Sequence, residues 1–312
     1  MSQETIEDVK PSMLYKYRVY NDYSIPMLTS GTLWAAKPST LNDPFECQKM
    51  LRGFATSAAK ARERHWATFV FFKMNELKSR VKSGQGWNGI SNRGLRILQN
   101  RLESSGSLDD ALAIMRMVFS DGNGNPDLKE PTDFMDLAER TLREVGIVSL
   151  SARVDEMLMW SHYAGSHHGY CLGFEVSSGA PLADSVHTSQ VEYSADVPEL
   201  DLDKLLIKKA FYPVGPFGRP HFETSLQLET ESLRKVLFRK SPEWAYEEEW
   251  RHVVERGNRE IQYPGRLREV VFGLRMAEAT RQSLKNALPS TSGITFREVV
   301  VSSTSALEIR DL

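Results

Sequence analysis

The chain has 312 residues, of which 41% are hydrophobic and 26% are charged, a composition typical of a globular protein. Its 39 basic and 41 acidic residues give a formal net charge of -2, which excludes an overall basic surface for nucleic acid or membranes but leaves a local basic groove open. The two cysteines exclude a disulfide framework, and no stretch approaches the roughly 20 apolar residues of a membrane span. We expect a soluble, cytoplasmic protein with no membrane partner.

The first elements are two predicted strands with a short helix between them. Aromatic and basic residues alternate from Leu14 to Tyr20, a period of two that predicts a strand with Lys16 and Arg18 on one face. Residues 25–31 predict a short helix that ends at a glycine, and residues 32–36 predict the second strand.

A turn-rich loop with two prolines follows, from Pro38 to Glu46. Because a residue before proline avoids the helical region, Asp43 before Pro44 predicts a loop of fixed, extended shape. Asn42, Asp43 and Glu46 are its polar candidates, although an ordinary turn closed by Asp43 is the simplest interpretation.

Residues 50–145 change in character and predict a helical insertion or cap within a single domain that spans residues 1–312. Helix-forming runs cover residues 58–82, 108–119 and 131–145, separated by glycine- and asparagine-rich breaks.

The sheet resumes at residues 146–151, where Ser149 and Ser151 point to the same face of the predicted strand. Residues 157–164 follow with helical spacing, and residues 169–176 predict another strand. Further along we expect a weaker strand at 191–193, a helix over 222–238, a strand at 270–272, a helix at 277–288 and a strand at 296–301.

The acidic run Glu247-Glu248-Glu249 is the strongest candidate site, since it stands between Tyr246 and Trp250 and leads into Arg251 and a predicted strand. On a strand, Glu247 and Glu249 would share one face. Two buried carboxylates on one face are costly unless a cation or a cationic transition state compensates them. A solvated acidic turn is the alternative interpretation.

Other chemistries have weaker support. The spacing of His162, His167 and His168 does not match a helical metal pair, so we expect no metal site. A serine hydrolase that uses Ser161 or Ser166 would lack the G-x-S-x-G elbow. No dinucleotide-binding glycine motif and no phosphate-binding loop occurs in the chain.

Three candidates remain, each on a predicted strand. They are Arg18 on an early strand, the Ser149/Ser151 pair on a central strand and the Glu247/Glu249 pair on a late strand, and the two members of each pair are two residues apart. An arginine grips a diphosphate or a carboxylate, and a glutamate beside a sugar stabilises an oxocarbenium-like transition state. Trp160 and Tyr163, three apart on a predicted helix, could stack on a flat heterocycle or pack in the core.

The order of several motifs resembles a bacterial family catalogued as domain of unknown function 2971, from about Leu14 to Gly273. These motifs are Leu-Tyr-Lys-Tyr-Arg, Asn-Asp-Pro-Phe-Glu, Ser-Leu-Ser, Leu-Met-Trp-Ser-His-Tyr-Ala, His-Gly-Tyr-Cys-Leu-Gly-Phe, Lys240 and Tyr-Glu-Glu-Glu-Trp-Arg. The family carries no assigned activity.

The Arg, Ser-x-Ser, Glu-x-Glu order is in turn similar to the R-S-E class of ADP-ribosyltransferases, whose split sheet binds NAD. This resemblance implies that Arg18 contacts the NAD phosphates or ribose, that Ser149 and Ser151 shape the nicotinamide pocket, that Glu249 stabilises the oxocarbenium ion and that Glu247 activates the acceptor. The helical insertion and the lack of a clear phosphate-contacting loop depart from that class.

We therefore expect an α+β fold with a mixed or antiparallel, ADP-ribosyltransferase-like split sheet, and an enzyme that uses NAD as substrate to modify a macromolecule, either protein or nucleic acid, as a toxin or phage-defence effector. The alternatives are a metal-dependent nuclease and a ligand-binding sensor module that catalyses no reaction. The oligomeric state stays open. Besides the residues with implied roles, Trp160 and Tyr163 are candidates for binding NAD. The other candidate pocket residues are Tyr17, Asn42, Asp43, Glu46, His162, Lys240 and Arg251.

Overall fold

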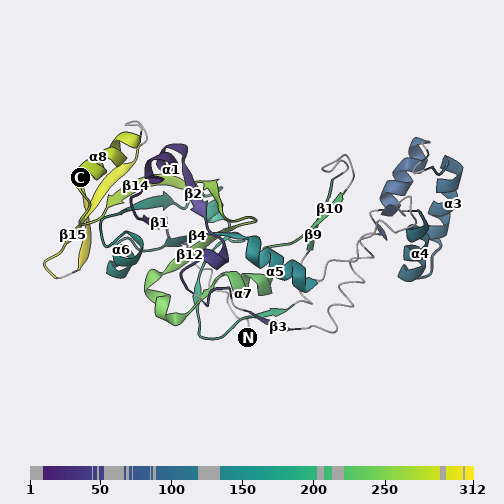
Figure 1. Ribbon diagram of the computed structural model, residues 1–312, viewed down its shortest axis with the longest axis horizontal. Coiled ribbons are helices and arrows are strands. Elements are labelled where there is room, and N and C mark those ends of the chain that lie inside the picture. Colours follow the sequence, from purple (N-terminus) through teal and green to yellow (C-terminus); the bar gives the residue numbers. More distant parts are fainter. Residues whose placement is uncertain are drawn as a thin grey trace. The chain divides into compact units, whose positions relative to one another are not determined.

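The fold was analysed in a computed structural model of the chain (Figure 1). The structure describes residues 10–43, 45–47, 49–52, 67, 70–71, 73–84, 86, 89–118, 134–201, 207–212, 221–288, 293–304 and 306–312. Of the predicted helices, most of residues 58–72 and the stretch from 119 to 133 lie outside the described residues.

The chain divides into two compact units. The first comprises residues 1–50, 140–200 and 206–312, and the second comprises residues 51–139 and 201–205. The expected role of residues 50–145 as a cap stays a prediction. None of the described helices is long and apolar enough to cross a membrane.

An eight-stranded sheet in the first unit confirms the α+β class and the mixed, mostly antiparallel sheet. Its order is β16-β15-β14-β5-β1-β4-β12-β6, and β14 with β15 is its parallel pair. The bounds are β1 Met13–Arg18, β4 Gly146–Ser151, β5 Tyr170–Glu175, β6 Thr188–Gln190, β12 Glu249–Val254, β14 Arg266–Phe272, β15 Thr295–Val301 and β16 Leu307–Asp311.

The neighbouring strands β1 and β4 of this sheet stay paired at only one position. β1 pairs with β5 along its whole length, at six positions from Met13 to Arg18, but it pairs with β4 at one position, Tyr15 with Ser151. β4 instead continues its ladder with β12, again over six positions. The sheet is therefore joined at one point between β1 and β4 and open beyond it.

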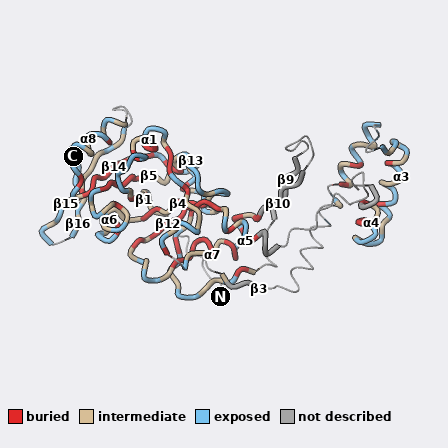
Figure 2. Tube along the Cα trace, in the orientation of Figure 1, coloured by how far each residue is buried: buried red, intermediate tan, exposed pale blue. Residues whose placement is uncertain are grey.

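Alternation along the strands gives the sheet two apolar faces, and buried residues follow its central strands (Figure 2). On one face Leu172 and Phe174 of β5 pack with Leu28 of helix α1 (Ser24–Ser30) and Leu284 of helix α8 (Glu278–Ala287). On the other face the neighbouring Cys171 packs with Met159 and Trp160 of helix α6 (Met157–Tyr163). The second core also contains Tyr17 of β1, and it holds α6 beside this strand.

Smaller elements complete the described part. The remaining strands form two-stranded sheets: β2 Thr32–Ala35 with β13 Arg259–Gln262, β3 Met50–Arg52 with β8 Glu199–Asp201, β7 Glu192–Tyr193 with β11 Arg239–Lys240, and β9 Ile207–Tyr212 with β10 His221–Leu226. The other helices are α5 Phe134–Glu144, α7 Glu231–Leu237 and the 3-10 helices η1 Pro38–Thr40, η2 Pro181–Ala183 and η5 Pro242–Glu247.

In the second unit, helices α3 (Asn92–Glu103) and α4 (Leu108–Val118) enclose a small core of their own together with the helical residues 73–83. Leu77, Leu95 and Met115 are its most buried members. Helix α3 begins at Ser91, whose hydroxyl accepts a hydrogen bond from the Gly94 N–H and so caps the helix.

Two predicted elements differ from the structure. The predicted helix at 222–238 is wrong in its first part, because residues 221–226 pair with residues 207–212 as a hairpin and the helix begins at Glu231. The predicted strand around Glu247 begins only at Glu249, since Pro242 starts a 3-10 helix that ends at Glu247. Glu248 between them has left-handed backbone angles, φ 41° and ψ 51°, which turns the chain.

Candidate functional site

Three carboxylates surround one ammonium group at the start of β12. Lys240 Nζ lies 2.7 Å from Glu247 Oε2, 3.3 Å from Glu249 Oε2 and 3.4 Å from Glu46 Oε1. All four side chains are buried, with exposed fractions of 4% or less. The buried carboxylate pair expected from the sequence therefore exists, and a cation compensates it.

Arg251 completes this charge cluster from the next inward-facing position of β12. Its Nε and Nη2 donate to the two oxygens of Glu249 at 3.0 and 3.1 Å, and Nη2 also lies 3.1 Å from Glu46 Oε2. Its Nη1 donates to the Leu237 carbonyl. The charge cluster thus holds three carboxylates and two cations, and Arg251 binds both oxygens of Glu249 in a bidentate contact.

Neighbouring strands hold the backbone at Glu247 and Glu249. Ser151 Oγ donates to the Glu247 carbonyl at 2.6 Å, and the Tyr193 hydroxyl accepts from the Glu249 N–H at 2.7 Å. The left-handed Glu248 between them keeps both flanking carboxylates buried while its own side chain is 46% exposed. The turn, and not strand alternation, therefore places the pair on one side.

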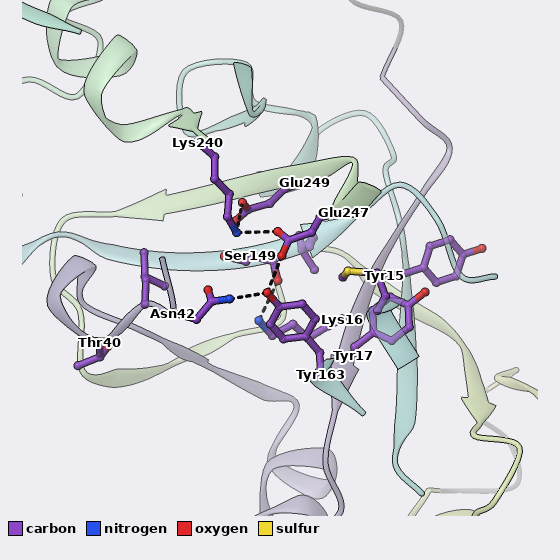
Figure 3. Close-up of a pocket in the computed structure, with 13 residues that line it drawn as sticks. Tyr15, Lys16, Tyr17, Thr40, Asn42, Ser149, Tyr163, Lys240, Glu247 and Glu249 are labelled. Atoms are coloured by element: carbon purple, nitrogen blue, oxygen red, sulfur yellow. Dashed lines mark hydrogen bonds and ion pairs between the residues drawn. The ribbon is translucent and has the colours of Figure 1, made fainter. Parts of the chain in front are cut away.

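Glu247 forms part of the wall of a pocket of about 230 Å³ (Figure 3). The Tyr163 hydroxyl donates to Glu247 Oε1 at 2.5 Å and accepts from Asn42 Nδ2 at 2.6 Å. The pocket is lined by Tyr15, Lys16, Tyr17, Thr40, Leu41, Asn42, Ser149, Leu150, Met159, Tyr163, Lys240, Glu247 and Glu249. We call it the Glu247 pocket.

Lys16 lies at the opening between β1 and β4, where the ladder stops. Its Nζ donates to the Ser149 carbonyl at 2.8 Å, in place of a backbone partner from β1. No ion pair joins Lys16 to a carboxylate of the described residues. A lysine thus faces the Glu247 pocket with hydrogen-bonding capacity left for a ligand.

Burial and pairing shift the pKa values of these groups in different directions. Burial, only partly offset by Lys240, raises the pKa of Glu247. Burial acts the same way on Glu249, but Arg251 and Lys240 outweigh it and bring the pKa of Glu249 down to about 2. Burial, assisted by Arg18, lowers the pKa of Lys16 to about 8. Burial and pairing therefore separate the two carboxylates of the acidic run, since the pKa of Glu247 is raised and that of Glu249 is lowered.

Most of the predicted site residues converge. The charge cluster contains Glu46, Lys240, Glu247, Glu249 and Arg251, and the Glu247 pocket adds Tyr17, Asn42, Ser149 and Tyr163. Ser151 contacts the backbone of Glu247 and supports the turn from outside the pocket lining.

Four predicted residues lie elsewhere. Arg18 does not line the Glu247 pocket; its guanidinium donates to the Met27 sulfur. Trp160 is fully buried and donates to the Val154 carbonyl, so it packs in the core. Asp43 Oδ1 accepts from the Phe45 N–H, as in an ordinary Asx turn. Asp43 and His162 line a second cavity.

Lys16, which was not among the candidate site residues, lines the Glu247 pocket. Lys16 shares its strand face with Arg18, and the residue that reaches the pocket is the lysine two positions earlier. Tyr193, which holds the Glu249 N–H, carries no sequence signal because it comes from a two-residue strand 56 positions away. Within the described ranges, no cluster of three or more His, Cys, Asp or Glu side chains is arranged to hold a metal ion.

The comparisons agree with the family resemblance over part of the chain. The family model "Protein of unknown function (DUF2971)" matches residues 159–252, a narrower stretch than Leu14 to Gly273. The match contains Tyr163, Lys240 and the acidic run, whereas Lys16 and Asn42 lie outside it. Searches of curated proteins and of solved structures returned no match.

Proposed function

We propose that this chain is an NAD-consuming enzyme of the ADP-ribosyltransferase type, in which Glu247 is the carboxylate that faces the substrate. The observation that carries the proposal is the opening between β1 and β4, with a buried acid on its wall. An ADP-ribosyltransferase-like split sheet is part of the same proposal, because that class binds NAD where its sheet divides.

Glu247 suits the catalytic role better than Glu249. Both oxygens of Glu249 accept from Arg251, which makes Glu249 a fully compensated structural anion. Glu247 lines the pocket as Glu249 does, but it accepts from the neutral Tyr163 hydroxyl on one oxygen and from Lys240 on the other. A positive charge that develops next to Glu247 would be stabilised by a carboxylate whose side chain is only 4% exposed.

In the proposed reaction the bond between nicotinamide and the ribose C1′ breaks, and nicotinamide leaves as a neutral molecule with the bonding electrons. The acceptor nucleophile forms the new bond to C1′, and its proton passes to Glu247 and then to solvent. Asn42 and the Tyr163 hydroxyl offer polar contacts for the ribose hydroxyls. Lys16 takes the place proposed for Arg18 as the cation that faces the anionic part of the donor.

Release of nicotinamide from NAD tests this proposal, with and without chelator and with cellular protein and RNA as acceptors. Glu247→Gln keeps the shape of the side chain but removes the base, and we expect it to lower turnover at least about 100-fold. Glu248→Gln is the matched control, since its side chain is half exposed and turned away, and we expect a rate within about twofold of the parent.

The result also separates the alternatives. A wild-type protein that releases no nicotinamide under any of these conditions would refute the proposal, as would full activity of Glu247→Gln. Nucleic-acid cleavage that chelator abolishes would point to the nuclease, although Glu46, Glu247 and Glu249 are already paired with Lys240 and Arg251. Ligand binding without turnover would indicate a sensor module.

A further inference from the structure

A second cavity, of about 800 Å³, lies in the same unit as the Glu247 pocket. We call it the aromatic cavity. It is lined by Asp43, Phe45, Leu158, His162, Ala195, Val197, Arg239, Ser241, Pro242, Glu243, Trp244 and Tyr246. This volume is within the usual range for small-molecule sites.

The two cavities share a wall. At five places, consecutive residues contribute one side to each cavity, the Glu247 pocket first: Asn42 and Asp43, Met159 and Leu158, Tyr163 and His162, Lys240 and Ser241, and Glu247 and Tyr246. Lys240 Nζ also lies 4.8 Å from the centre of the Trp244 ring, a cation–π contact across this wall. The aromatic cavity is therefore built on the elements that position the candidate acid.

Three rings form a broken row along the aromatic cavity. Tyr246 lies between Trp244 and His162, with ring centroids 6.1 and 6.3 Å apart and interplanar angles of 38° in both pairs. Trp244 and Tyr246 are half-buried and His162 is exposed. All three rings line the aromatic cavity, and stacking of a base on an aromatic side chain is a common source of affinity.

Two polar groups on this cavity wall lack hydrogen-bond partners. Asp43 is 3% exposed, and its Oδ2 has no partner although Oδ1 accepts from Phe45. Arg239 is 8% exposed, and its Nε has no partner although Nη2 donates to the Ser194 carbonyl at 2.5 Å. Buried polar groups are usually satisfied, so these two mark a place for a ligand with both a donor and an acceptor.

We propose that the aromatic cavity binds the purine base of a nucleotide. A purine has a flat face for Tyr246 and Trp244, an amino or ring N–H that donates to Asp43, and ring nitrogens that accept from Arg239. The inference stands apart from the reaction at Glu247, because a base can bind here whether or not the Glu247 pocket cleaves NAD.

Calorimetric titration with AMP and GMP tests the proposal, with nicotinamide mononucleotide as the ligand that has a ribose phosphate but no purine. We expect binding of at least one purine nucleotide at about 1 mM or below, and at least tenfold weaker binding of nicotinamide mononucleotide at this cavity. Asp43→Asn replaces the unpaired acceptor by a donor and should weaken purine binding about tenfold. Tyr246→Leu removes the stacking face and should weaken it by a similar factor.

Tyr23→Leu is the matched control for loss of an aromatic ring, since Tyr23 is 69% exposed and lines neither cavity; it should bind as the parent does. Thermal unfolding must show that both cavity variants are folded. If no purine nucleotide binds, or if Asp43→Asn and Tyr246→Leu both bind with parental affinity, the inference is overturned. Purine binding without nicotinamide release would retain this site and refute only the reaction.

Discussion

Replacement of Lys240 by methionine removes the ammonium group that all three buried carboxylates share. Lys240 is 3% exposed, and its nearest anionic partner, Glu247, is at 2.7 Å. In the Lys240→Met variant, Arg251 is the remaining cation of the charge cluster, and its donors already point to Glu249 and Glu46. Glu247 is then a buried carboxylate with Tyr163 as its remaining side-chain partner.

Loss of one partner from a buried ion pair usually costs about 3–5 kcal/mol, because the other charge stays behind without compensation. We expect Lys240→Met to lower the free energy of unfolding by about that amount at pH 8. Lys235→Met is the control, because Lys235 and Glu231 pair at 2.8 Å with exposed fractions of 58% and 79%. Loss of this surface pair should cost within about 1 kcal/mol.

The cost in the Lys240→Met variant should also depend on pH. The pKa of Glu247 in the folded parent is already raised by burial, and loss of Lys240 removes an interaction that lowers it. A carboxyl with a raised folded pKa binds a proton more readily in the folded than in the unfolded state, so stability falls as pH rises through that range. The penalty of Lys240→Met should therefore be smaller at pH 5 than at pH 8.

Urea unfolding of the two single variants and of Lys240→Met/Glu247→Gln completes the measurement as a double-mutant cycle. The single lysine variant leaves three carboxylates against one cation, whereas the double variant leaves two against one, so its excess charge equals that of the parent. We expect the double variant to be more stable than Lys240→Met. Additive losses, or a Lys240→Met cost equal to that of Lys235→Met, would refute the compensation argument.

Two further predictions concern acid stability and backbone packing. Burial lowers the pKa of His252 to about 4, so its charged form is disfavoured in the folded state and the free energy of unfolding should fall as pH drops from about 6.5 to 4. His252→Gln should flatten this slope in unfolding curves measured against pH. An unchanged slope would contradict the assignment. At Gly169 an added Cβ would stand 2.1 Å from the Arg18 carbonyl oxygen, so Gly169→Ala should lower the free energy of unfolding by about 3 kcal/mol. Gly106→Ala is the control, because a Cβ there would have nothing within 4 Å, and it should not lower this free energy. Equal losses of the two variants in urea unfolding would refute the clash.

The sequence predicted those parts of the fold that local pattern controls. The alternation from Leu14 to Tyr20 and the apolar run at 169–176 both correspond to central strands, β1 and β5, because period two is a property of each strand alone. The hairpin at 207–212 and 221–226 was missed, since its strands pair with each other and the pattern near residue 222 also suits a helix. Pairing partners are not visible in one segment.

The site shows the same division. The aromatic and acidic run predicted that Glu247 and Glu249 are buried together, because aromatic residues beside carboxylates are unusual in a solvated turn. Their arrangement was not predictable: it depends on the left-handed Glu248 and on contacts from Ser151 and Tyr193, which lie far away in the sequence. The choice between Lys16 and Arg18 likewise depends on where β1 and β4 separate.

The charge of the cluster links its structure to the ligand it would accept. With three carboxylates and two cations, one negative charge is left uncompensated. Burial raises the pKa values of Glu46 and Glu247, so the charged forms of these two carboxylates are the ones that the cluster disfavours. A proton on one of them would remove the excess, and so would a ligand with positive charge. Glu247, on the pocket wall, can meet such a ligand. The nicotinamide ring of NAD is cationic until its glycosidic bond breaks, after which the charge passes to the ribose. In the proposed reaction, the same carboxylate would stabilise the bound donor and the cation that follows it, and a larger stabilisation of the second would make the site catalytic.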